Sequence, residues 1–341
     1  MRSWRFLAVA FSFAWLACVG PPALAQHGRD VAPAPQAGTP SGANPTAQAV
    51  SEQQLLQELN RLQGRVTIPD AKAAILEQPQ GRSYQSFHER WLPWIGGILI
   101  VAVLAGLAIF YAVRGRIELD VPETGIKILR FNVVERLTHW MTAASFIVLA
   151  LTGLNYVFGK RLIFPVVGPD AFATWSQWAK FAHNATAWPF MLGILIMLLV
   201  WIRDNVPDRY DMVWLRQMGG FFSRRHPPAR RFNAGQKLMF WSVMLGGGAL
   251  SVSGIIMLFP FSGLDINGMQ WAQYVHAFTG VVMIGIILGH IYIGTLGMEG
   301  AYDAMGSGEV DLAWARAHHS AWVEEQDRDL PRTRPESVPA E

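Results

Sequence analysis

Five long apolar runs dominate the chain from residue 94 onward, and polar segments separate them. Each run holds close to 20 residues without Lys, Arg, Asp or Glu. About 20 helical residues, rising about 1.5 Å each, cross the hydrocarbon core of a bilayer. The pattern therefore predicts five transmembrane helices, over Trp94–Val113, Trp140–Phe158, Thr186–Ile202, Leu238–Phe259 and Val275–Thr295.

The first 93 residues follow a different pattern. Arg2 and Arg5 precede an apolar stretch that ends in small residues before Gln26, which predicts a cleaved secretory signal over residues 1–25. An uncleaved first span is the alternative. Residues 26–93 then predict an exported linker rich in Ala, Pro and Gly. One short amphipathic helix within it, over residues 51–66, contacts a partner subunit or the membrane surface in this interpretation.

Composition supports the assignment to membrane proteins. Hydrophobic residues make up 51% of the chain, charged residues only 16%, and the mean hydropathy is +0.22, which excludes an ordinary water-soluble domain. The one cysteine, Cys18, lies inside the predicted signal. A cleaved chain would therefore hold no thiolate metal site, iron–sulfur cluster or covalently attached haem.

The positions of the basic residues predict an orientation. Segments 114–138 and 203–237 are rich in Lys and Arg, whereas 159–182 holds three such residues and 260–274 holds none. The positive-inside rule places the first two segments in the cytoplasm. The mature N-terminus is then periplasmic and residues 296–341 form a cytoplasmic tail. Net charge is only +3, so membrane lipid is expected as a partner and nucleic acid is not.

Four histidines lie at or within the ends of the predicted spans, where an ionisable side chain is costly and indicates function. They are His139, His183, His276 and His290. For any one of them, an interhelical hydrogen bond is the alternative role. The other five lie in polar segments and are expected to be solvated: His27, His88, His226, His318 and His319.

The predicted topology sorts these four histidines into two depths. His276 and His290 are 14 residues apart on one span, which is close to four helical turns and about 21 Å of rise, so they share a helix face. His183 lies at the depth of His276, and His139 at the depth of His290. Each pair would give one haem two axial imidazoles, an arrangement suited to electron transfer.

Other uses of buried histidines fit less well. Zinc needs three or four ligands that converge on one point. A proton relay in a transporter normally includes intramembrane Asp, Glu or Lys, and the centres of the five spans have none. The expected cofactors are therefore two haem b groups, held without covalent bonds.

Three groups of residues resemble the gamma (cytochrome b) subunit of membrane-bound formate dehydrogenase. The first two are Glu135-Arg136-Leu137-Thr138-His139-Trp140 and Asn233-Ala234-Gly235-Gln236-Lys237 followed by Phe240-Trp241-Ser242, and the third is the His276 and His290 pair. The resemblance covers about residues 128–322. The diheme subunits of nickel–iron hydrogenases share the general plan and are the second interpretation.

The resemblance implies haem ligands and a quinone site. It implies His139 with His290 at a cytoplasmic haem and His183 with His276 at a periplasmic haem. Quinone would bind beside the cytoplasmic haem, where the matching residues are Asn233, Gly235, Gln236 and His290. A competing explanation for two of these is local, because Asn233 with Gln236 three residues later is also a helix-capping pattern.

The expected fold is all-α and integral to the membrane. A four-helix haem-binding bundle occupies residues 114–295, and residues 94–113 add one N-terminal transmembrane helix that packs beside it. The expected function is that of a subunit in the bacterial inner membrane that carries electrons to quinone. An iron–sulfur beta subunit, docked on residues 51–93, and a molybdenum or tungsten alpha subunit would supply them, with no formate-oxidising site on this chain. A haem-free anchor or transporter is the alternative of a different class.

Overall fold

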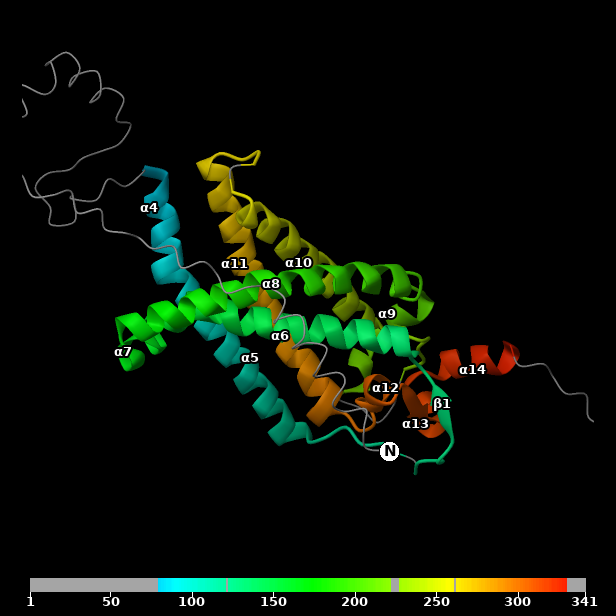
Figure 1. Ribbon diagram of the computed structural model, residues 1–341. Coiled ribbons are helices and arrows are strands. Elements are labelled where there is room, and N and C mark those ends of the chain that lie inside the picture. The colour runs from blue at the N-terminus through cyan, green and yellow to red at the C-terminus, as the bar shows by residue number, and fades with distance from the viewer. Residues whose placement is uncertain (1–78, 121, 222–226, 261, 330–341) are drawn as a thin grey trace, which may run out of the picture. The chain divides into compact units, whose positions relative to one another are not determined.

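Five long helices form the main body of the protein (Figure 1). The computed structural model describes residues 79–120, 122–221, 227–260 and 262–329, which all belong to Pro79–Glu341, the second of the two units into which the chain divides. The predicted signal peptide with Cys18, the helix over 51–66, His27 and His226 lie outside the described residues.

The long helices are α5 (Leu92–Arg114), α6 (Val133–Leu162), α8 (Pro169–Trp201), α10 (Ala234–Leu258) and α11 (Ile266–Tyr292). All five are long and apolar enough to cross a membrane. This confirms the five predicted spans within the described part of the chain and the all-α membrane fold. Three short elements continue them: α4 (Pro79–Ser86) and η1 (Phe87–Trp91) lead into α5, and η3 (Ile293–Gly297) follows α11.

Two of the helices extend well beyond the predicted spans. α6 ends at Leu162 and α8 begins at Pro169, with the short helix α7 (Phe164–Val167) between them. The predicted third span starts only at Thr186, because polar residues such as Gln177, Lys180 and Asn184 interrupt the apolar run although the backbone stays helical. His183 therefore lies well inside α8 rather than at its start.

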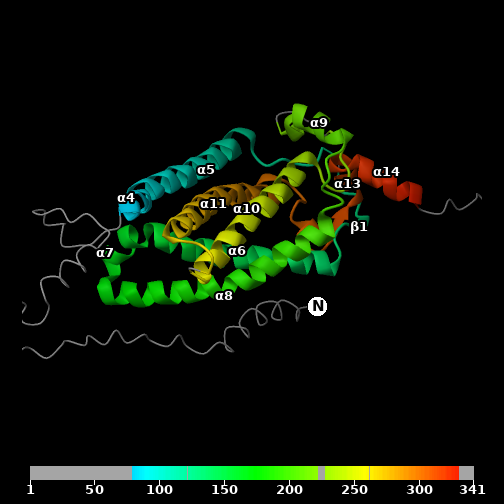
Figure 2. The same cartoon turned by 90° about the horizontal axis from the view of Figure 1, so that it is seen from above.

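Glycines lie at two close helix crossings. A Cβ at Gly193 of α8 would lie 2.1 Å from Oγ1 of Thr142 on α6, so no side chain fits there. A Cβ at Gly285 of α11 would lie 3.3 Å from Cδ2 of Leu99 on α5. Figure 2 shows α5 running along α11, with α10 next to α11 and α6 next to α8, and residue contacts join each of these pairs. The additional helix α5 thus packs beside the bundle, as expected.

A mixed structure closes the bundle at the end where α6 and α10 begin. It consists of the described residues of 115–132, 202–233 and 298–329, and we call it the cap. β1 (Lys127–Leu129) and β2 (Glu309–Asp311) pair antiparallel in it, with Lys127 opposite Asp311. Its helices are α9 (Arg209–Arg216), η2 (Met218–Gly220), α12 (Asp303–Gly306), α13 (Leu312–His318) and α14 (Ser320–Asp329), and both views show α13, α14 and β1 at this one end.

Residues 298–329, which belong to the predicted cytoplasmic tail, are folded into the cap. The Asp311 carboxylate accepts hydrogen bonds from the backbone N–H groups of Thr124, Gly125 and Ala313 and from the Thr124 hydroxyl. Burial raises the pKa of Asp311, but these four donors outweigh it and hold the pKa below its ordinary value. The carboxylate therefore ties the strand β2 to the segment that precedes β1.

The expectation that His318 and His319 are solvated was wrong. His319 is only 1% exposed, and its Nδ1 lies 2.7 Å from the carbonyl oxygen of Arg230, to which it donates. His318 is buried against the ring of Trp314, 4.8 Å between centroids. Burial lowers the pKa of His319 well below its ordinary value, and the nearby charge of Arg130 adds to this. These residues are part of the packed interior of the cap.

Candidate functional site

The structure places the four span histidines in two pairs. The ring centroids of His139 and His290 lie 6.1 Å apart with an angle of 61° between the planes, and those of His183 and His276 show the same two values. α6 and α8 supply one histidine each, and α11 supplies both of the others. These are the pairs expected from the sequence.

The pairs are two separate centres. His276 and His290 are 14 residues apart on α11, which separates them by about 21 Å along the helix axis. Among the described residues, no group of three or more His, Cys, Asp or Glu side chains is close enough to hold a metal ion. Each centre therefore offers two imidazoles from the described part of the chain.

The geometry of each pair fits axial ligation of a haem iron. Two imidazole nitrogens bound on opposite sides of one metal, each about 2 Å from it, place the ring centroids about 6 Å apart. His290 is exposed and the other three are partly exposed, which leaves space around the rings. In addition, Nδ1 of His139 is buried without a hydrogen-bond partner in the described part of the chain.

Two hydroxyl groups orient the rings of the second pair. Oγ1 of Thr152 on α6 lies 2.8 Å from Nδ1 of His183, and Oγ of Ser253 on α10 lies 3.0 Å from Nδ1 of His276. In each ring the second nitrogen stays available for a ligand. Sequence reasoning missed both hydroxyls.

A shared sequence feature could have revealed these hydroxyls. Each is followed by glycine, Gly153 and Gly254, and a Cβ at those glycines would lie 3.7 and 3.4 Å from Cε1 of the histidine. A hydroxyl residue followed by glycine inside an apolar span is thus the local signal. A Cβ at these distances would be in ordinary van der Waals contact with the ring, so the glycines mark where each imidazole approaches the backbone.

The residues expected at a quinone site lie at the cap ends of α10 and α11. Asn233 caps α10: the Gln236 N–H donates to Asn233 Oδ1 at 2.9 Å, and the Asn233 N–H donates to Gln236 Oε1 at 3.0 Å. The capping explanation of these two residues is therefore confirmed. Gly235 allows close packing, because a Cβ there would lie 2.6 Å from Cη2 of Trp214. His290 contacts His139 rather than this trio.

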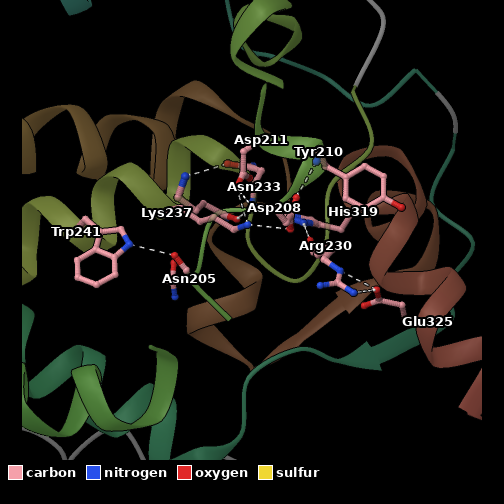
Figure 3. Close-up of polar contacts among 11 residues, drawn as sticks. Asn205, Asp208, Tyr210, Asp211, Arg230, Asn233, Lys237, Trp241, His319 and Glu325 are labelled. Carbon is pink, nitrogen blue, oxygen red and sulfur yellow. Dashed lines mark hydrogen bonds and ion pairs between the residues drawn. The ribbon is translucent and has the colours of Figure 1, made fainter. Parts of the chain in front are cut away.

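Ion pairs hold the start of α10 to α9. The Lys237 ammonium is buried and lies 2.9 Å from Oδ2 of both Asp208 and Asp211 (Figure 3). The same two carboxylates cap α9. Figure 3 also shows the Trp241 indole N–H donating to the Asn205 carbonyl, 3.0 Å away. The start of α10 is thus fixed by charge pairing and by capping together.

A second cluster of polar contacts, where the cap meets α6 and α8, forms around Arg130 and Arg231. Glu135 accepts hydrogen bonds from Arg231 at 2.7 Å and from the Trp201 indole at 2.8 Å. Arg130 is 2% exposed, donates to the Arg231 carbonyl at 2.7 Å, and lies over three aromatic rings. Those rings are Phe131, Trp314 and Trp322, with the guanidinium carbon 5.2 to 5.5 Å from each centroid.

This environment changes the acidity of Arg130 without removing its charge. Burial lowers the pKa of Arg130 to about 9, and the positive charge of Arg231 adds to the effect. Arg130 still carries its proton at neutral pH. The aromatic rings compensate part of the cost by cation–π contact, which joins the segment before α6 to α13 and α14.

Comparison with known proteins identifies the family. The family described as prokaryotic cytochrome b561 matches residues 130–308, a range that contains all four paired histidines, both hydroxyls and the α10 capping box. The formate dehydrogenase cytochrome b556(fdo) subunit of Escherichia coli K12 is 30% identical over 202 residues, which cover 58% of this chain and 92% of that protein.

Two further relatives carry the same kind of name. The nitrate-inducible formate dehydrogenase cytochrome b556(Fdn) subunit of Escherichia coli K12 is 27% identical over 208 residues, covering 59% of this chain and 92% of the relative. The formate dehydrogenase cytochrome b556 subunit of Haemophilus influenzae is 25% identical over 206 residues, covering 59% and 84%. The chain therefore belongs to the prokaryotic cytochrome b561 family of haem b membrane proteins, together with the cytochrome b556 subunits of formate dehydrogenase.

Proposed function

We propose that this protein is the cytochrome b subunit of a membrane-bound formate dehydrogenase and that it carries electrons across the bilayer to quinone. The observation that carries the proposal is the arrangement of the four histidines in two centres. In each centre the two ring centroids lie 6.1 Å apart, and α11 supplies one histidine to each. When bound, a b haem at each centre supplies a one-electron carrier with no open coordination position. The names of the relatives support formate as the electron source.

The charge distribution supports an orientation in the bacterial inner membrane. The cap contains most of the basic residues of the described chain, including Arg130, Arg209, Arg230 and Arg231, whereas α11 and α10 are joined at the other end by a segment without Lys or Arg. The positive-inside rule then places the cap in the cytoplasm. His139 and His290 form the cytoplasmic centre, and His183 and His276 form the periplasmic centre.

The quinone site belongs at the cytoplasmic centre in this proposal. Reduction of a quinone consumes protons, and the cap presents polar groups at that end of the bundle. Asn233, Gly235, Gln236 and His290 come from the adjacent ends of α10 and α11. The Gln236 side-chain oxygen takes part in the capping box. The NH₂ group of the same amide is the proposed donor to a carbonyl oxygen of the quinone.

Partner subunits complete the pathway. An iron–sulfur beta subunit would deliver electrons at the periplasmic centre, and a molybdenum or tungsten alpha subunit would oxidise formate. Residues 51–93 are the proposed contact with the iron–sulfur subunit, and α5 packs beside the haem bundle; both lie before residue 130, outside the range matched by the family.

The experiment that tests the proposal is a reduced-minus-oxidised spectrum of the purified complex, together with haem extraction. Two noncovalent b haems per chain, both reduced when formate is added, are expected. A chain without b-type absorbance would be a haem-free anchor and would end the proposal. Reduction by hydrogen and not by formate would assign the chain to a nickel–iron hydrogenase instead.

Replacement of Gln236 by glutamate separates the capping role from the quinone role. Glutamate keeps the acceptor for the Asn233 N–H, because α6 uses the same box with Asn132 and Glu135. It removes the NH₂ donor and adds a charge. We expect both haems to be retained and reduced by formate, while the rate of quinone reduction falls by about 10-fold or more, roughly the loss of one hydrogen bond to a substrate.

A matched control is available on the same helix. Ser242 is half-buried and donates to the Leu238 carbonyl of its own helix at 2.8 Å, so Ser242→Ala is expected to leave quinone reduction unchanged. Unchanged quinone reduction in Gln236→Glu would limit Gln236 to its capping role.

A further inference from the structure

The hydroxyl groups of Thr152 and Ser253 each make two kinds of hydrogen bond. Oγ1 of Thr152 lies 2.7 Å from the carbonyl oxygen of Val148, and Oγ of Ser253 lies 2.6 Å from that of Ala249. A carbonyl oxygen carries no hydrogen, so two oxygens this close must share the hydroxyl hydrogen. Each hydroxyl therefore donates to the backbone of its own helix, one turn back.

That donation determines the role of the hydroxyl toward histidine. A hydroxyl has one hydrogen, and here it is already used, so only lone pairs remain for the ring nitrogen. Nδ1 of His183 at 2.8 Å, and Nδ1 of His276 at 3.0 Å, must then carry the hydrogen of the contact. Both imidazoles are thus held as the tautomer with Nδ1–H, and Nε2 presents its lone pair to a metal.

The other histidine pair differs. His139 has its Nδ1 buried without a hydrogen-bond partner in the described chain, although it lies on the same helix as Thr152. A ligating imidazole that donates its second N–H becomes a stronger electron donor to the metal. A stronger donor stabilises the oxidised metal and so lowers its reduction potential. The two centres therefore differ in their hydrogen bonds: both rings of one have a hydroxyl partner, whereas His139 of the other has none in the described chain.

We propose that Thr152 and Ser253 are positioning residues that fix the tautomer of His183 and His276 and lower the reduction potential of that centre relative to the His139 and His290 centre. The inference rests on the proposed function, which puts a haem at each centre. Its consequence is directional: electrons that enter at the His183 and His276 centre move to the other centre with a favourable free energy.

Potentiometric titration of the purified complex tests this. Thr152→Val and Ser253→Ala remove one acceptor each and keep the volume of the side chain nearly constant. Each is expected to raise the reduction potential of the haem between His183 and His276 by about 59 mV. This corresponds to a shift of about 10-fold toward the reduced form for one electron. The potential of the other haem is expected to stay the same, and it serves as an internal reference.

Three further variants make the result specific. Thr152→Ser keeps the hydroxyl and is expected to restore the potential. Ser251→Ala removes a hydroxyl on the same helix as Ser253, one that donates to the Gly247 carbonyl and contacts neither histidine pair in the described chain, and is expected to shift neither haem. Thr152→Cys replaces the hydroxyl by a weaker sulfur acceptor and is expected to give a smaller shift than Thr152→Val. It tests the same contact if Thr152→Val loses its haem.

Unchanged potentials in Thr152→Val and Ser253→Ala, with both haems present, would overturn this inference and leave the proposed function intact. Equal shifts of both haems would also overturn it, because they would indicate a general structural effect. A wild-type complex with no haem between His183 and His276 would overturn the inference and the proposed function together.

Discussion

Replacement of His276 by alanine is expected to remove one b haem and to leave the other, so that about half of the reduced-minus-oxidised absorbance is lost. The reason is geometric. His276 faces His183, with ring centroids 6.1 Å apart, and lies about 21 Å along α11 from His290, so the two centres do not share a ligand. Haem extraction and the spectrum of the purified complex measure the loss.

The matched change at the other centre is His290→Ala, which is expected to remove the second haem and to spare the first. His88→Ala is the control, because His88 lies in η1 outside both pairs and should keep both haems. Retention of both haems in His276→Ala would show that the pairing is wrong. Loss of both, with helical circular dichroism unchanged, would show that the centres are not independent.

Replacement of Glu135 by alanine is expected to lower the free energy of unfolding by about 3 kcal/mol, within the range for breaking one side of a buried ion pair. Glu135 is 3% exposed and accepts hydrogen bonds from Arg231, Trp201 and the Asn132 backbone. The alanine variant leaves all three donors without this acceptor. Thermal unfolding of the solubilised protein, followed by circular dichroism, measures the change.

An adjacent ion pair provides the control. Glu325 lies 2.7 Å from Arg230, but both side chains reach solvent, 37% and 52% exposed. An exposed pair contributes less than about 1 kcal/mol, so Glu325→Ala is expected to change stability little. Equal effects of the two variants would refute the structural role assigned to the buried Glu135 network.

The sequence was sufficient to predict the five spans and the pairing of the histidines. Each span is a continuous apolar run, and the 14-residue spacing of His276 and His290 is a direct consequence of helix geometry. Both signals are local in the chain and depend on no tertiary contact. The capping box of Asn233 and Gln236 could be predicted for the same reason.

Features that depend on contacts between distant residues could not be predicted. The antiparallel pair of β1 and β2 joins residues 180 to 184 positions apart, and each strand has only three residues, too few for a period to be visible. His318 and His319 lie in a polar stretch, yet Trp314 and Arg230 cover them. Thr152 and Ser253 looked like ordinary small polar residues in a span, because their partners are on other helices.

Because α11 supplies a ligand to both centres, the distance between them is set by the rise of one continuous helix. Electron tunnelling slows steeply with distance, and a helix backbone resists stretching far more than a contact between two helices does. In the proposed electron transfer, tilting of α6 or α8 would change the distance between the two rings of one centre, while α11 would keep the separation of the two centres. The separation of the two centres along α11 is thus set by the covalent chain rather than by contacts between helices.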